Sequence, residues 1–138
     1  MPRMVRTAPC GISESRTRLK TARAYLDVAR TTLDERAGDE FLSVAAGLAV
    51  LAGIAAPDAI CCVRRRCRHR GDDHRQAADL LKSAVPDGSQ LAATFLRLLD
   101  AKDEAHYGVI IASRRRASEV VRWAGKLVER TGDEVERG

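Results

Sequence analysis

The sequence is poor in aromatic residues, and it lacks the patterns on which sheet-based folds depend. Aromatic side chains make up 4% of the 138 residues, whereas apolar residues as a whole make up 45%. An interior filled mainly by Ala, Leu and Val suits closely packed helices better than half-buried strands. We find no internal repeat, no Gly-rich phosphate loop and no alternating strand pattern, so the sequence predicts an all-α protein.

Cysteine is also scarce. The four cysteines are Cys10, Cys61, Cys62 and Cys67. Two are adjacent and three lie within seven positions, which predicts no disulfide framework in a chain long enough to fold without one. Cys62, Cys67, His69 and His74 offer possible zinc ligands, but the single residue between Cys67 and His69 leaves little room for the usual finger geometry. We therefore expect no metal, no cofactor and a reducing, cytoplasmic setting.

The chain does not open with a long apolar run. Residues 1–13 are predicted to form a flexible arm rather than a secretory signal. The membrane candidate is 44–60, whose 17 residues include Pro57 and Asp58 and lie at the short limit for crossing a bilayer. We expect a buried central helix here, and no membrane association.

The spacing of apolar residues predicts about five helices in a single up-down bundle over residues 14–132. The first helix spans 14–36, and Gly38 closes it in a left-handed conformation. The second spans 39–63, is apolar nearly all round and should occupy the centre, with a bend or break at Pro57.

Three more helices follow the basic segment after residue 63. Asp72 or Asp73 is expected to cap the third helix, Ser89 the fourth and Ser113 the fifth. Gly132 is expected to end the fifth helix, which leaves 133–138 as a frayed tail.

Positive charge is concentrated within a modest net charge of +5. The stretch 64–75 holds six arginines against two aspartates, and 114–116 adds a second cluster. Such patches can hold phosphate backbones, although solvated helix ends are the alternative. The candidate binding residues are Arg64, Arg65, Arg66 and Arg68.

One segment of the fourth helix carries a family resemblance. Lys102-Asp103-Glu104-Ala105-His106-Tyr107 stands where members of the HEPN superfamily of helical bundles carry an Arg-Asn-x-Ala-Asp-Tyr type motif. The segments RLKTARAYLDVARTTL and ASEVVRWAGKLVERTGDEVE are similar to the first and last helices of that family. The resemblance implies a HEPN-like fold, a homodimer, and a partner such as an antitoxin or a nucleotidyltransferase.

The same segment supplies the catalytic candidates. Lys102 and His106 are four residues apart and share a helix face, and Asp58 is the expected carboxylate partner of Lys102. His74 should turn toward the core side of the third helix, so that it can join Asp58, His106 and Tyr107 in one pocket. Structural histidines at helix junctions are the alternative.

Three functions remain open. The first is a non-catalytic HEPN-like binding module for a protein or for nucleic acid. The second is a metal-independent ribonuclease of toxin-antitoxin type, since HEPN ribonucleases are characterised by Arg, four to six residues, then His. The pair Lys102 and His106 departs from that pattern, whereas Arg68 and His74 match it at a different place in the chain. The third is a helical bundle that binds a small molecule or nucleotide.

Overall fold

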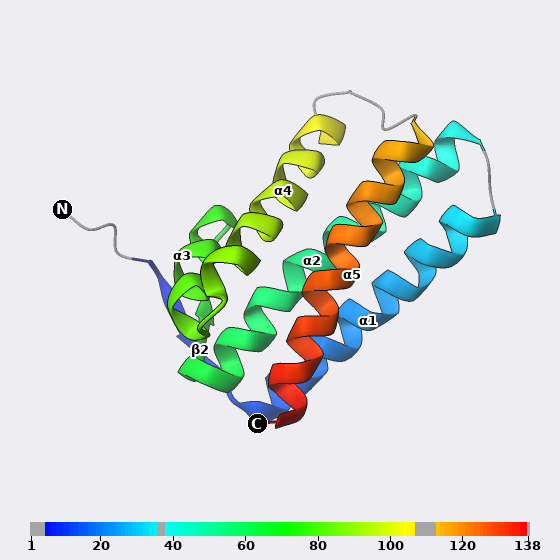
Figure 1. The fold of residues 1–138 in the computed structure, drawn as a ribbon. Helices are drawn as coiled ribbons and strands as arrows, with labels where there is room; N and C mark the ends of the chain where they lie inside the picture. Colours follow the sequence, from blue (N-terminus) through cyan, green and yellow to red (C-terminus); the bar gives the residue numbers. More distant parts are fainter. Residues whose placement is uncertain (1–4, 36–37, 107–112, 138) are drawn as a thin grey trace.

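The protein is a five-helix bundle with one small two-stranded sheet, as a computed structural model shows (Figure 1). The structure describes residues 5–35, 38–106 and 113–137. The elements are β1 (Thr7–Pro9), α1 (Ile12–Glu35), α2 (Asp39–Arg65), β2 (Cys67–His69), α3 (Arg75–Ala84), α4 (Gly88–His106) and α5 (Arg114–Arg137). The all-α prediction is confirmed.

Helix α2 lies at the centre of the bundle, as its sequence predicts. It packs against all four other helices, and alanine is the commonest residue at its buried positions. It is long and apolar enough to span a bilayer, but 72% of its most apolar window is buried inside the bundle. The helix runs continuously through the buried Pro57, so the expected break is absent. Small side chains let its neighbours approach closely, and a Cβ on Gly53 would lie 2.3 Å from Leu98 Cδ1.

The chain between α3 and α4 turns within a few residues, as the Pro-Asp-Gly sequence predicts. Helix α3 ends at Ala84, and α4 begins at Gly88, one residue before the predicted cap Ser89. A Cβ on Gly88 would lie 2.3 Å from the Leu81 carbonyl oxygen, so glycine permits the close approach of the two helices. Ser113 does cap α5, since its hydroxyl accepts a hydrogen bond from the Arg116 backbone N–H at 3.2 Å.

Two predicted helix ends are wrong. Gly38 is extended at φ −73°, not left-handed, and it precedes α2 as its N-terminal cap. Gly132 does not end α5, because the helix continues to Arg137 with Glu134 and Val135 buried. Residues 133–137, expected to be frayed, are therefore helical. Packing against α1 and α2 extends a helix that local signals alone would have ended.

The start of the chain differs most from prediction. Strand β1 pairs antiparallel with β2, with Thr7 opposite His69 and Pro9 opposite Cys67, so the part of the predicted arm that the structure describes is ordered. Cys10 forms a disulfide with Cys62 of α2. The prediction of no disulfide is wrong, because partners 52 residues apart are brought together by the fold and not by their spacing.

Candidate functional site

A polar cavity of about 320 Å³ lies where α1, α2, β2 and the start of α3 meet. We call it the Asp58 cavity. Its lining combines charged and hydrogen-bonding side chains with an apolar wall, and it consists of Arg18, Thr21, Tyr25, Leu51, Ile54, Ala55, Asp58, Arg68, His69, Gly71 and His74. Three of these residues, Asp58, Arg68 and His74, are sequence-predicted site residues that the fold brings together.

Asp58 is the acidic group of the cavity. Burial raises its pKa above the ordinary value of 3.8, while the positive charges of Arg18 and Arg68 pull in the opposite direction. Asp58 lies on the central helix, so the surrounding helices partly shield its carboxylate from water. A carboxyl group in this setting can exchange a proton, or accept a hydrogen bond from a ligand, closer to neutral pH than an exposed one.

His69 is the least satisfied polar group of the site. Its side chain is only 6% exposed, and its Nε2 atom is buried without a hydrogen-bond partner. Strand β2 fixes its backbone through the pairing with Thr7. Buried polar atoms in folded proteins nearly always have a partner, so this nitrogen of a cavity-lining residue is available to a ligand or to a water molecule.

His74 stands beside His69 at the entry to α3. The two imidazole rings are 6.3 Å apart between centroids and tilted by 59°. Burial lowers the pKa of His74 below 6.5, and the charge of Lys102 lowers it further. The ring is therefore neutral near pH 7, with one nitrogen to donate and one to accept.

Two arginines give the cavity its positive charge. Arg18 comes from the first turns of α1, and Arg68 comes from β2, where its guanidinium donates to the His69 carbonyl oxygen at 3.3 Å. With Asp58 as the acidic residue of the lining, the two arginines and Asp58 together carry a formal charge of about +1. That balance suits an anionic ligand.

Lys102 does not belong to this cavity. It is exposed on α4 and lines a smaller hollow of about 120 Å³ with Asp72, Asp73, His74, Arg75, Leu99 and Asp103. The predicted pairing of Lys102 with Asp58 is therefore wrong, since an exposed ammonium group needs no buried partner. The side chain of His106 and all of Tyr107 lie outside the described residues, so the structure does not place these two candidates.

The predicted basic patch is divided among different tasks. Arg64 and Arg65 extend α2, and Arg66 ends it in the left-handed region at φ 56°. Arg64 forms an ion pair with Glu134 of α5, and Arg65 donates to the Ser83 carbonyl oxygen at 3.4 Å. Arg68 turns into the Asp58 cavity instead. Consecutive arginines thus serve the bundle and the cavity separately.

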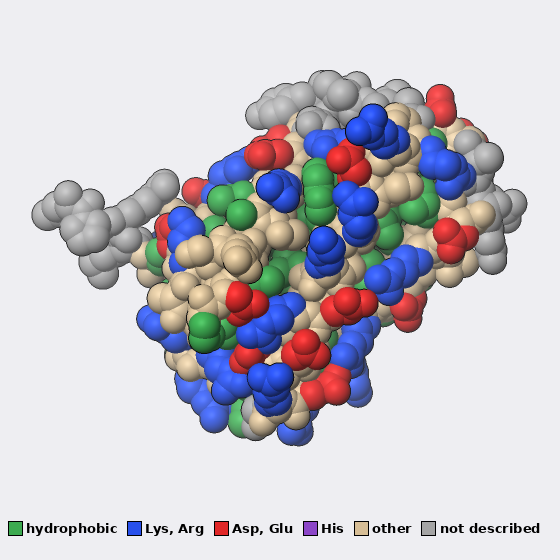
Figure 2. Space-filling model, viewed as in Figure 1, with side chains coloured by type: hydrophobic (Ala, Val, Ile, Leu, Met, Phe, Trp, Pro, Cys, Tyr) green, Lys and Arg blue, Asp and Glu red, His purple; other side chains and the backbone are tan. Residues whose placement is uncertain are grey.

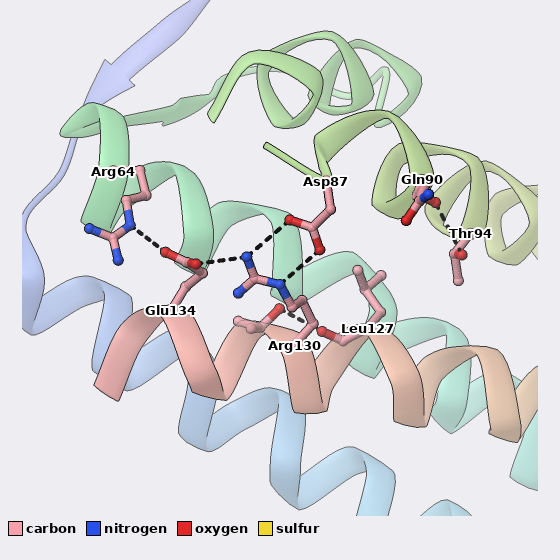
Figure 3. Close-up of polar contacts among 8 residues, drawn as sticks. Arg64, Asp87, Gln90, Thr94, Leu127, Arg130 and Glu134 are labelled. Carbon is pink, nitrogen blue, oxygen red and sulfur yellow. Dashed lines mark hydrogen bonds and ion pairs between the residues drawn. The ribbon is translucent and has the colours of Figure 1, made fainter. Parts of the chain in front are cut away.

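A second polar cluster, which we call the Arg130 network, joins α2, α5 and the turn before α4 (Figure 3). Arg130 donates from Nε and a terminal nitrogen to both Asp87 carboxylate oxygens, at 2.8 and 3.0 Å. It also pairs with Glu134 at 2.7 Å, and Glu134 in turn pairs with Arg64. Hydrogen bonding to Arg130 holds the pKa of Asp87 below its usual value. Every charge in this network has a partner.

The molecule also exposes an uncharged face along α1 and α2, which we call the α1–α2 face. Among the described residues, the large apolar side chains that remain exposed are Val28, Phe41, Val44 and Leu51, and all four lie on these two helices. A groove of about 370 Å³ between the helices is lined by Thr21, Ala24, Tyr25, Val28 and Leu48. It shares Thr21 and Tyr25 with the Asp58 cavity. By contrast, Figure 2 shows basic and acidic side chains interspersed over α4 and α5.

Metal ligation finds no support in the described part of the chain, where no three His, Cys, Asp or Glu side chains are placed to hold one ion. Cys62, one of the four ligands considered for zinc, is bonded to Cys10. Cys61 is buried, which raises the pKa of its thiol to about 12, so it remains protonated.

Comparison with known proteins adds no assignment. The chain matches no family model, no curated protein and no solved structure. The candidate site therefore depends on its own geometry.

Sequence reasoning missed four polar members of this site, namely Arg18, Thr21, Tyr25 and, as a cavity residue, His69. Arg18 and Tyr25 flank the apolar stripe of α1, where periodicity assigns them to the surface. The available signal was the position of Thr21 and Tyr25, which lie next to the apolar stripe rather than opposite it on the helix. His69 had no such signal, because the strand that carries it is too short to show a pattern.

Proposed function

We propose that the protein is a HEPN-like, non-catalytic helical binding module that holds one nucleotide unit in the Asp58 cavity. The observation that carries the proposal is the buried, unpartnered Nε2 of His69 beside two arginines. An isolated polar nitrogen costs free energy in the empty state. A ligand oxygen that accepts from it, or a ligand donor that bonds to it, removes that cost.

The lining of the cavity matches the parts of a nucleotide. Arg18 and Arg68 can hold a phosphate, for which a guanidinium fork is well shaped. Asp58 and His74 can bond to the polar edge of a base, while the apolar wall that includes Ile54 accepts its flat face. The volume of about 320 Å³ is at the lower end of ordinary ligand sites, so it accommodates a single nucleotide unit.

Calorimetric titration tests the proposal with two probes, a free nucleoside monophosphate and a short single-stranded RNA. Arg68→Gln should weaken binding by about tenfold or more, because a charge-assisted hydrogen bond is lost. Arg70→Gln is the matched control, since Arg70 is exposed two residues away on the same segment, outside the cavity. Binding should also weaken steeply with salt if RNA is the physiological form. Equal loss in both variants, or no binding of either probe, would remove the assignment.

A ribonuclease is the second candidate, because Arg68 and His74 line the same cavity. Five residues separate Arg68 from His74, which fits the pattern of Arg, four to six residues, then His. A neutral His74 would act as general base toward a ribose hydroxyl, and Arg68 would stabilise the charge on the phosphate. His74→Asn should then lower RNA cleavage by roughly two to four orders of magnitude. Absence of cleavage by the wild-type protein rejects this candidate and leaves the binding module.

The α1–α2 face supports a homodimer as the assembled form. Val44 and Leu51 project beside Gly47, where a Cβ would meet nothing within 4 Å, so a ridge and a hollow alternate along one helix. Two copies related by a twofold axis can fit the ridge of each into the hollow of the other. Leu51→Lys should shift sedimentation toward monomer, while Arg122→Glu on the exposed side of α5 should not. Equal sedimentation of the wild type and Leu51→Lys contradicts the dimer surface.

A further inference from the structure

The Cys10–Cys62 disulfide joins the start of the chain to the central helix. Cys10 lies between β1 and α1, and Cys62 lies within the last turn and a half of α2. Both side chains are buried, at 7% and 0% exposure. The bond therefore holds the end of β1 against the part of α2 that carries the Asp58 cavity.

Strand β1 in turn holds β2 in place. Thr7 pairs with His69 and Ala8 pairs with Arg68. Backbone bonds continue the ladder on both sides, from the Arg70 N–H to the Arg6 carbonyl at 2.8 Å and from the Cys10 N–H to the Arg66 carbonyl at 3.1 Å. The two cavity residues Arg68 and His69 are thus presented by a strand whose only ladder partner in the described sheet is β1.

The side chains of β1 contribute little to its attachment to the bundle. Thr7 and Pro9 are exposed, and Ala8 is only half-buried. A pair of three-residue strands is too short to be stable by itself in water. The neighbouring Cys10 is the first buried residue of the described chain, and the bond to Cys62 ties its side chain to α2.

We propose that this disulfide is a redox latch on the Asp58 cavity, so that the oxidised protein binds ligand strongly and the reduced protein binds it weakly. The proposal rests on the proposed function, because it concerns the same cavity. A small dithiol supplies the reducing electrons. One of its thiolates attacks a sulfur of the Cys10–Cys62 bond, its second thiol closes a cyclic disulfide, and Cys10 and Cys62 leave as thiols.

The physical effect follows from the loss of a cross-link. Once the bond is cut, β1 is held by its short ladder and by its link to α1, so the pairing that orders Arg68 and His69 is weakened. If β1 and β2 are then paired in about one molecule in ten, the apparent affinity for the ligand falls about tenfold, because only that fraction is competent to bind. The helices keep their own core, so their content should not change.

Hydrogen exchange and nucleotide titration test the latch on the full chain. Dithiothreitol treatment should accelerate exchange of the Arg70 and Cys10 amides, leave far-ultraviolet circular dichroism unchanged and weaken nucleoside monophosphate binding about tenfold. Cys10→Ala should reproduce all three results without reductant. Cys67→Ser is the matched control, since it removes a half-buried free thiol of β2 and keeps the disulfide.

The outcomes separate the latch from the proposed function. If reduction speeds hydrogen exchange of the β1–β2 amides but the protein binds no nucleotide in either state, the disulfide is a latch on the sheet and the ligand assignment is overturned. Equal affinity in both redox states overturns the latch and keeps the ligand. Four free thiols in the protein purified without reductant, counted by alkylation and mass spectrometry, also overturn the latch. If Cys10→Ala does not fold, the dithiothreitol-treated wild type gives the same readings.

Discussion

Two polar clusters involve the C-terminal half of α2, and they differ in how their charges are satisfied. In the Arg130 network, Asp87 is bonded to Arg130, and Glu134 pairs with Arg130 of its own helix and with Arg64 of α2. In the Asp58 cavity, a carboxylate has a raised pKa and His69 Nε2 has no partner. The first arrangement stabilises the bundle, whereas the second keeps polar groups available.

The difference shows how a structural cluster and a ligand site can be distinguished without relatives. Paired charges of complementary geometry lower the free energy of the fold. Partly buried groups with no partner raise it, and a fold retains them where a ligand satisfies them. Asp87 and Asp58 illustrate the contrast, because hydrogen bonds lower the pKa of one and burial raises the pKa of the other.

The largest expected effect comes from breaking the Arg130 network. Arg130→Ala removes three hydrogen bonds to carboxylates and leaves the nearly buried Glu134 with one partner. The free energy of unfolding should fall by about 2 to 3 kcal/mol. Urea denaturation followed by circular dichroism measures it. Arg122→Ala, an exposed arginine on the same helix, should stay within about 0.5 kcal/mol of wild type, and equal effects would contradict a structural role for the network.

Removing the cavity carboxylate should act in the opposite direction. Asp58→Asn keeps the shape but removes a charge that burial disfavours, so the free energy of unfolding should rise by up to about 1 kcal/mol. The same variant should bind nucleotide more weakly than wild type. A loss of stability comparable to that of Arg130→Ala would mean that Asp58 is a paired structural group, and the contrast between the clusters would disappear.

The pH dependence of stability sharpens the comparison further. The folded pKa of His74 lies below 6.5, so the unfolded chain takes up a proton first, and stability is lost as pH falls from about 7 through 6.5. Asp87 and Glu134 have lowered folded pKa values, so their contribution is present above about pH 5 and is lost as pH falls through 4.

Urea midpoints between pH 4 and 8 distinguish these two windows. His74→Asn should flatten the change between about pH 7 and 5 by a fraction of a kcal/mol and leave the acid limb intact. Arg130→Ala should flatten the acid limb instead. An unchanged profile in His74→Asn would show that this histidine does not report on the cavity.

The smallest expected effect concerns Arg68. Arg68→Gln and Arg70→Gln should each change the free energy of unfolding by no more than about 0.5 kcal/mol, because neither guanidinium forms an ion pair in the described structure. Thermal denaturation of both variants checks this. A cost of several kcal/mol for Arg68→Gln alone would assign Arg68 to the bundle rather than to the ligand.

The sequence by itself determined the helical architecture of this protein. Apolar spacing placed the helices within a few residues of their observed bounds, and the composition of 39–63 identified the central helix, because a helix buried on all sides must be apolar on all sides. It also singled out Asp58, Arg68 and His74, since charged or titratable residues next to apolar stripes are uncommon. These features are local, and local pattern suffices to reveal them.

Tertiary structure alone decided which of those residues meet. The disulfide joins positions 52 residues apart. The strand that presents His69 forms by pairing with β1, about 60 residues earlier in the chain. Burial of Glu134 and the separation of Arg64 from Arg68 likewise depend on how α5 and α1 pack against α2. Contacts between distant segments are set by the free energy of the whole core, and no window of the sequence contains that information.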